Sequence, residues 1–149
     1  MSSTGLEVFD KTLQATNHWL KLMMLELATD DRCLAFQALR GVLHAVRDRI
    51  GPENAVHLGA QLPMLLRGAY YEGWHPAGTP THERHLEDFV DHVAAELPRD
   101  AEVGPGQAAQ AAFWAMAACL DAGEMTKLRH TLPHEALNLW PEELLAARH

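Results

Sequence analysis

Apolar residues recur along this chain at spacings of three and four, which is the period of an amphipathic helix. The first stripe contains Phe9, Leu13, Leu20, Met23 and Leu27. It predicts a helix over about residues 5–28, with one face turned toward a core.

The following segments carry start and stop signals as well as apolar stripes. Thr29 to Asp31 are N-cap candidates for a second helix, which should end at the pair Gly51 and Pro52. A short third helix is expected over 53–61, and a fourth from Pro63 to about residue 71, because proline is tolerated at a first helical position. No stretch alternates apolar and polar residues between turn signals, so the predicted fold is all-α.

The second half of the chain resembles the first at an offset of about 70 residues. In this register Trp19 corresponds to Phe89 and Leu62 corresponds to Leu132. Helix breaks and apolar faces keep the same register over about fifty positions. The pattern predicts a tandem duplication of two related four-helix units packed as one compact helical domain, with unit boundaries at 1–74 and 75–149.

Composition narrows the class of protein further. The 149 residues are 48% hydrophobic, which is sufficient for one compact domain. With 20 acidic residues against 12 Lys plus Arg, the net charge of −8 argues against a nucleic acid partner. The longest apolar run, "LKLMMLELA", is too short to span a membrane, and "MSSTGLEVFD" lacks the basic region of a secretory signal. No membrane partner and a cytoplasmic location are therefore expected.

Motifs for catalysis are absent from the sequence. Serine occurs only as Ser2 and Ser3, and no glycine-rich phosphate loop is present. Cys33 and Cys119 lie inside apolar helical patterns, so they are expected to be small buried thiols rather than nucleophiles. No catalytic residue is predicted, and a non-enzymatic protein is favoured.

A basic stripe on the second predicted helix consists of Arg40, His44 and Arg47. Such a stripe can hold a phosphate or an acidic partner. The alternative is a solvated face whose cations pair with acids nearby.

The junction between the two halves, "YYEGWHPAGTPTHERHLEDF", concentrates aromatic and polar residues. Gly73 and Pro76 interrupt a helix there, so the segment is expected to be a linker. Its aromatic residues either form a recognition platform for a partner or join the two units together. The candidate partner-binding residues are Tyr70, Tyr71, Trp74, His75 and Arg84.

On the helix after the linker, His85, Asp88, His92 and Glu96 share one ridge because they are spaced by three or four residues. Imidazole and carboxylate groups at this spacing can share one Zn, Fe or Mn ion. One ion would reach only two adjacent members of the ridge, so other ligands would have to come from elsewhere. The alternative is a half-exposed polar face without a cofactor. The candidate metal ligands are His85, Asp88 and His92.

Three stretches resemble one prokaryotic family, the domain of unknown function 2267. They are "FDKTLQATNHWLKLMMLEL", "AFQALRGVLHAVRDRIGPENAVHLGAQLPMLLRGAYYEGWHPAGTPTHERHLEDF" and "AGEMTKLRHTLPHEALNLWP". The resemblance implies a helical tandem-repeat protein of the bacterial cytosol with no established activity, cofactor or catalytic residue. Arg84 and His85 fit the family pattern, whereas His82 stands at a variable or basic position. His85 is therefore the better candidate for a shared role.

Together these features favour a non-enzymatic protein-binding or adaptor module with an unknown protein partner. Two alternatives stay open. One is a metal-binding protein that uses the ridge after the linker, and the other is a carrier with an apolar pocket for a small molecule between the units. The Met-rich first helix is also compatible with a homodimer.

Overall fold

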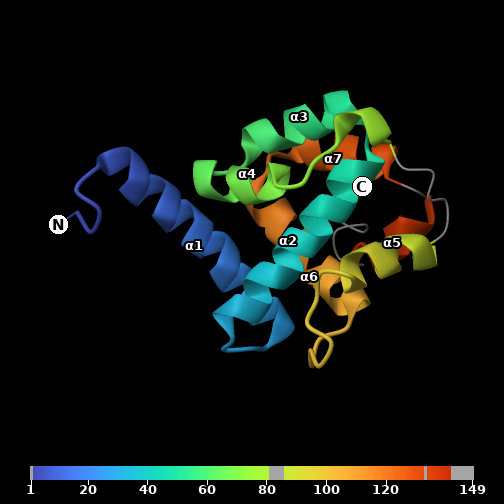
Figure 1. Cartoon of the computed structure of the whole chain (residues 1–149), viewed down its shortest axis with the longest axis horizontal. Helices are drawn as coiled ribbons and strands as arrows, with labels where there is room; N and C mark the ends of the chain where they lie inside the picture. Colours follow the sequence, from blue (N-terminus) through green and yellow to red (C-terminus); the bar gives the residue numbers. More distant parts are fainter. Residues whose placement is uncertain (1, 81–85, 133, 142–149) are drawn as a thin grey trace.

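The computed structural model describes residues 2–80, 86–132 and 134–141, and within these ranges the secondary structure is entirely helical (Figure 1). This confirms the predicted all-α class. The elements are α1 (Glu7–Leu27), α2 (Arg32–Arg49), α3 (Pro52–Gln61), α4 (Met64–Tyr71), η1 (Pro76–Gly78), α5 (Leu86–Ala94), α6 (Pro105–Cys119), α7 (Ala122–Thr131) and η2 (His134–Leu139).

The first four helices begin and end within a few residues of the predicted positions. At the start of α2, the Asp31 side chain accepts a hydrogen bond from the backbone N–H of Leu34 at 3.1 Å, so the predicted N-cap is confirmed. Between α2 and α3, Gly51 adopts a φ of 88°, a conformation that favours glycine, and Pro52 is the first residue of α3. The turn signals in the sequence therefore determine the element boundaries.

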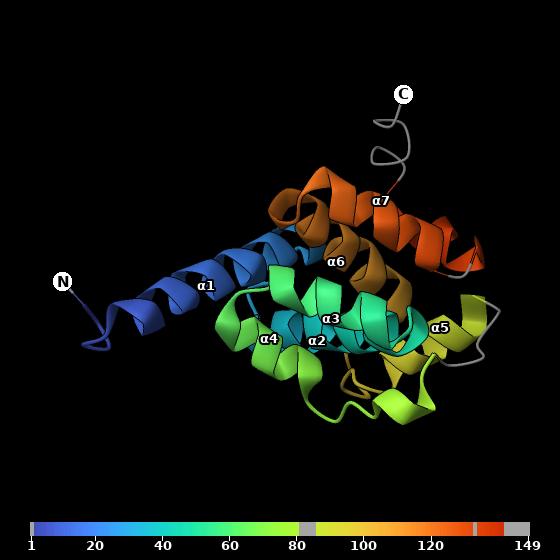
Figure 2. The same ribbon diagram turned by 90° about the horizontal axis from the view of Figure 1, so that it is seen from above.

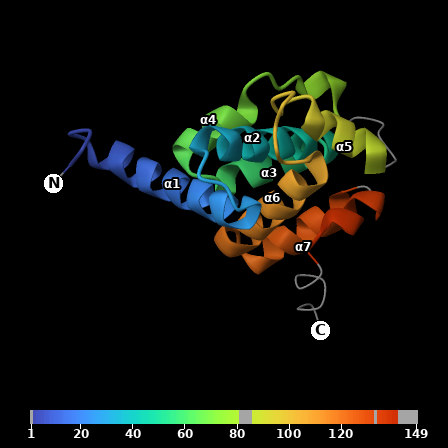
Figure 3. The ribbon, with the colours of Figure 1, turned by 90° about the horizontal axis from the view of Figure 1, so that it is seen from below.

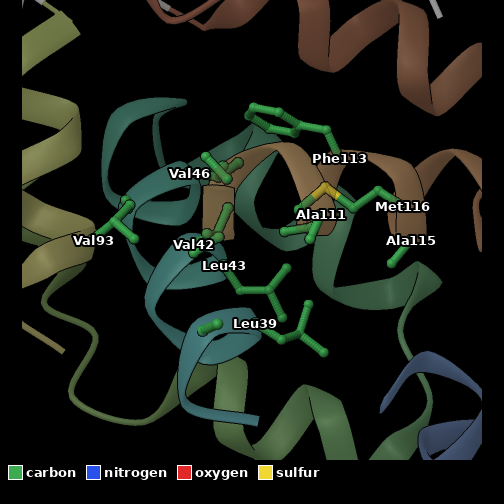
Figure 4. Packing of buried hydrophobic residues seen from close by; sticks show 14 of the residues in the cluster. Leu39, Val42, Leu43, Val46, Val93, Ala111, Phe113, Ala115 and Met116 are labelled. Atoms are coloured by element: carbon green, nitrogen blue, oxygen red, sulfur yellow. The ribbon is translucent and has the colours of Figure 1, made fainter. Parts of the chain in front are cut away.

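Helices α2 and α6 pack against each other at the centre of the molecule (Figure 4). Leu39, Leu43 and Val46 of α2 face Phe113 and Met116 of α6, and all five side chains are buried. Seven residues of α6 are buried, and five of them are alanines, so small side chains let neighbouring helices approach closely.

The other helices surround this pair. Helix α1 packs against both α2 and α6, whereas α3 and α4 pack against α2 (Figure 2). Helix α7 and η2 contact α6, and α5 lies against both central helices (Figure 3). The N-terminal and C-terminal halves thus share one hydrophobic core.

The N-terminal part of α1 projects beyond the body of the molecule (Figure 1). The buried residues of α1 begin only at Thr16, whereas the earlier apolar residues Val8 and Phe9 are exposed. At the edge of the body, the Thr12 hydroxyl accepts a hydrogen bond from the backbone N–H of Leu65 at 2.9 Å. Thr12 of α1 thereby caps one of the first N–H groups of α4.

One expectation needs correction. Cys33 is exposed rather than buried, because it lies in the first turn of α2 on the face turned away from the core. Thr79 is the C-cap of η1. In the described part of the chain α5 begins at Leu86.

Among the helices of the described residues, none combines the length and the apolar character that a membrane-crossing segment requires.

Candidate functional site

The two polar stripes that the sequence predicts separately meet in the structure. The stripe on α2 faces the end of the ridge that follows the linker, and the two are joined by ion pairs and hydrogen bonds. We call this group the interhelix polar cluster. It consists of Arg40, His44, Arg47, Asp48, His92 and Glu96.

His44 is the centre of the cluster. Its Nδ1 lies 2.7 and 2.9 Å from the two carboxylate oxygens of Glu96, and its Nε2 lies 2.7 Å from the carbonyl oxygen of Ala69 at the end of α4. Because both ring nitrogens face acceptors, the imidazole can donate to both only in its protonated form. The His44 side chain therefore links α2 to the segment after α5 and to α4.

Arg47 holds the start of the junction. Its Nη1 donates to the carbonyl oxygens of Tyr70 at 2.7 Å and Glu72 at 2.9 Å, and its Nε donates to Asp48 at 2.8 Å. The Arg47 side chain is only 5% exposed. These bonds satisfy carbonyl groups at the C-terminus of α4, which have no partner within the helix. A buried guanidinium on α2 thus satisfies carbonyl groups at the point where α4 ends and the linker begins.

Arg40 completes the cluster. Its Nε lies 3.4 Å from a Glu96 carboxylate oxygen, at ion-pair distance without hydrogen-bond geometry. Its guanidinium also lies over the Phe36 ring, 5.4 Å from the centroid, where a cation is attracted to the ring face. Nearby, His92 Nε2 lies 3.5 Å from Asp48. The basic stripe is therefore paired with acids of this chain, but it is largely buried rather than solvated.

Gly41 allows the cluster to form. A Cβ atom at this position would lie 3.3 Å from Glu96 Cβ and from the Val93 carbonyl oxygen, a tight contact. The segment after α5 approaches α2 this closely because position 41 has no side chain.

The aromatic residues of the junction pack as a stack against α3. Tyr70 is fully buried, and its hydroxyl donates to the Ala55 carbonyl oxygen at 2.7 Å. Burial raises the pKa of Tyr70 well above its ordinary value. The Tyr71 ring lies 5.0 Å from the Tyr70 ring and 5.3 Å from the Trp74 ring, measured between centroids. Gly59 makes room for the stack, because a Cβ there would lie 2.3 Å from the Tyr71 hydroxyl oxygen.

The candidate partner-binding residues differ in accessibility. Tyr70 is buried and supports the stack from within, Tyr71 and Trp74 are half-buried, and His75 is exposed. The Trp74 indole N–H is buried without a hydrogen-bond partner among the described residues. Arg84 lies outside those residues. The stack therefore acts as a joint between α3, α4 and the linker, with only part of its surface accessible.

The candidate metal ligands do not come together in the described part of the chain. His85 lies outside it, Asp88 is half-buried on α5, and the His92 Nε2 lies 3.5 Å from an Asp48 carboxylate oxygen. No group of three His, Cys, Asp or Glu side chains there could hold a metal ion.

Sequence reasoning missed three residues of this region. Asp48 pairs with Arg47, while Gly41 and Gly59 allow close approaches. The available signal was a glycine inside a helical pattern, which indicates close packing when it occurs away from a helix end.

The fold and this site define a class: an all-α protein in which buried polar side chains hold helices together. A family model matches residues 16–139, most of the chain, and the protein belongs to that family, described as Uncharacterized conserved protein (DUF2267). The resemblance seen in the sequence is thereby confirmed. No curated protein matches the chain.

Proposed function

We propose that the protein is a non-enzymatic protein-binding or adaptor module assembled from two related helical units. The observation that carries this proposal is the apolar surface formed by the projecting part of α1 and the start of α4. We call it the arm surface, and it consists of Leu6, Val8, Phe9, Met64 and Leu65.

A hydrogen bond between Thr12 and Leu65 brings the two parts of the arm surface near each other. Val8 and Phe9 precede Thr12 by four and three residues, so they lie on the same side of α1 as the contact with Leu65. Phe9 and Leu65 are each 50% exposed. Large apolar side chains that gather on a surface mark interaction sites more often than single exposed residues do.

A second copy of the chain is the partner that this surface fits best. The arm surface is self-complementary, because it combines a projecting helix with exposed apolar residues at the start of α4. In a twofold dimer, the projecting part of α1 from each copy can pack on Met64 and Leu65 of the other copy. On the arm, Glu7 and Lys11 form an ion pair at 3.2 Å, so its charges are partly balanced. The exposed apolar area is on the order of a few hundred Å² per copy, which suits a weak, concentration-dependent dimer.

Sedimentation velocity at several protein concentrations tests this proposal. We expect the wild type to dimerise as its concentration rises and Phe9→Asp and Leu65→Asp to remain monomeric, because each substitution places a charge in the interface. Leu25→Asp is the matched control, since Leu25 is 67% exposed at the opposite end of α1. A wild type that stays monomeric, or equal loss of dimer in the control, would refute the arm surface as the interface.

Element positions and burial support the proposed duplication. Helix α3 at Pro52–Gln61 and helix α7 at Ala122–Thr131 share the offset of about 70 residues. Leu62 and Leu132 are the C-caps of these two helices, and both are buried. The pairs Trp19 with Phe89 and Tyr70 with Trp140 are buried as well. In this arrangement α2 and α6 are the central helices of the two units.

A further inference from the structure

A small hollow lies between the end of α1 and the outer face of α6. Its volume is about 350 Å³, and its lining includes Glu26 and Leu27 from α1 with Gln107, Gln110 and Trp114 from α6. The three α6 residues share one face because they are spaced by three and four residues.

In the register of about 70 residues, this hollow corresponds to the interhelix polar cluster. Glu26 occupies the position of Glu96, Gln110 that of Arg40, and Trp114 that of His44. In the cluster, the Glu96 carboxylate pairs with His44 and Arg40 of the chain itself. At the hollow the arginine and the histidine are replaced by glutamine and tryptophan, neither of which carries a charge.

The two places also differ at one position of the central helix. Gly41 lets Glu96 pack against α2, whereas the corresponding residue on α6 is Ala111, which has a Cβ. In the interhelix polar cluster, the carboxylate of Glu96 is therefore paired with Arg40 of the same chain, and we call this the closed site. The hollow at Glu26 is the open site.

The open site favours a cation. Among the described residues no Lys, Arg or His lines the hollow, and no cation is paired with the exposed Glu26 carboxylate. Glu26 lies in the last turn of α1, a turn without a basic residue, so the negative end of the helix dipole adds to its charge. The half-buried Trp114 supplies an aromatic ring, the group on which cations stack most favourably.

We propose that this hollow binds a guanidinium group carried on a short alkyl chain. Glu26 accepts its N–H groups, Trp114 stacks on its plane, and Gln110 offers a further acceptor. A guanidinium is favoured over an ammonium because it is planar, weakly hydrated and able to form paired hydrogen bonds with a carboxylate. The related closed site accommodates the Arg40 guanidinium beside a carboxylate and an aromatic ring. The hollow lies at the opposite end of α1 from the arm surface, so its binding does not depend on dimerisation.

The test is NMR titration of the ¹⁵N-labelled full chain, followed at the Trp114 indole N–H. The probes are N-acetyl-L-arginine amide, methylguanidinium and, as the uncharged isostere, N-acetyl-L-citrulline amide. We expect saturable shifts with the arginine probe and none with the citrulline probe at the same concentration. Binding of methylguanidinium with equal affinity would indicate a free small guanidine as the ligand, and preference for the arginine probe would indicate an arginine side chain of a polypeptide.

Two variants and a control complete the test. Glu26→Gln should weaken arginine-probe binding by about tenfold or more, because it removes a charge-assisted contact. Trp114→Leu, read at the backbone amides of α6, should weaken it several-fold. Glu53→Gln makes the same charge change at an exposed position on α3 and should bind like the wild type. The proposal is overturned if neither cationic probe binds, if the citrulline probe binds equally, or if Glu26→Gln and Glu53→Gln have the same effect.

Discussion

Arg47 offers the most demanding test of how the polar cluster stabilises the fold. The substitution Arg47→Met keeps much of the aliphatic volume but removes the guanidinium. It leaves the carbonyl oxygens of Tyr70 and Glu72 without the Arg47 donor and removes the arginine that pairs with Asp48. The two carbonyls are at the end of α4, where no other helical N–H is available.

The size of the effect follows from burial. Removing one partner of a buried charged pair costs about 3–5 kcal/mol, since the remaining polar groups stay desolvated. The Asp48 side chain is 17% exposed, so water can reach it in part and the lower end of that range applies. For a chain of this size, about 3 kcal/mol corresponds to a decrease in Tm of roughly 6–12 °C.

Urea unfolding followed by circular dichroism measures this loss. Arg40→Met is the control, because the Arg40 side chain is 29% exposed and its Nε makes an ion pair without hydrogen-bond geometry. We expect it to cost about 1 kcal/mol or less. Equal destabilisation in the two variants, or an Arg47→Met variant within 1 kcal/mol of the wild type, would refute the role assigned to the buried bonds.

Two further predictions concern the thiols and the aromatic stack. Burial raises the pKa of Cys119, so at neutral pH less of it is thiolate and it should react with iodoacetamide more slowly than the exposed Cys33. The rate at which Cys119 reacts should rise as the pH is increased toward that raised pKa. Mass spectrometry after brief labelling distinguishes the two cysteines. Equal reaction rates at neutral pH would contradict the prediction. Gly59→Ala should displace the Tyr71 ring and lower the free energy of unfolding by about 1–3 kcal/mol, whereas Gly68→Ala, at an exposed helical position with open space, should be neutral or slightly stabilising. Denaturant melts of both variants check this, and similar stability would show that the close approach is unimportant.

The sequence predicted helices well where local signals were strong. The Asp31 cap, the Gly51 turn and the period of the apolar stripes are properties of neighbouring residues, and they located the first four helices within a few positions. The prediction that Cys33 is buried was wrong. Cys33 lies at the start of a helix, where the apolar stripe has not yet begun.

The candidate site was harder to predict because its contacts join distant parts of the chain. The basic stripe on α2 and the polar ridge after the linker could each be recognised from the spacing of their residues. Their pairing, however, depends on α5 packing against α2. His44 and Glu96 are 52 residues apart in sequence, and no local pattern relates them. The spacing of the ridge alone was compatible with a metal site or with a polar face, and in the structure its Glu96 end contacts a histidine and an arginine of α2.

The position of α6 has a consequence for how the chain is made. Helices α1 and α2 both pack against α6, which begins only at Pro105. During synthesis the first half therefore leaves the ribosome with its apolar face uncovered, and the core can close only after α6 has emerged. Contacts between such distant segments slow folding and prolong the exposure of apolar surface. A ribosome that pauses before codon 105 would thus hold a nascent chain open to chaperones and to other nascent copies.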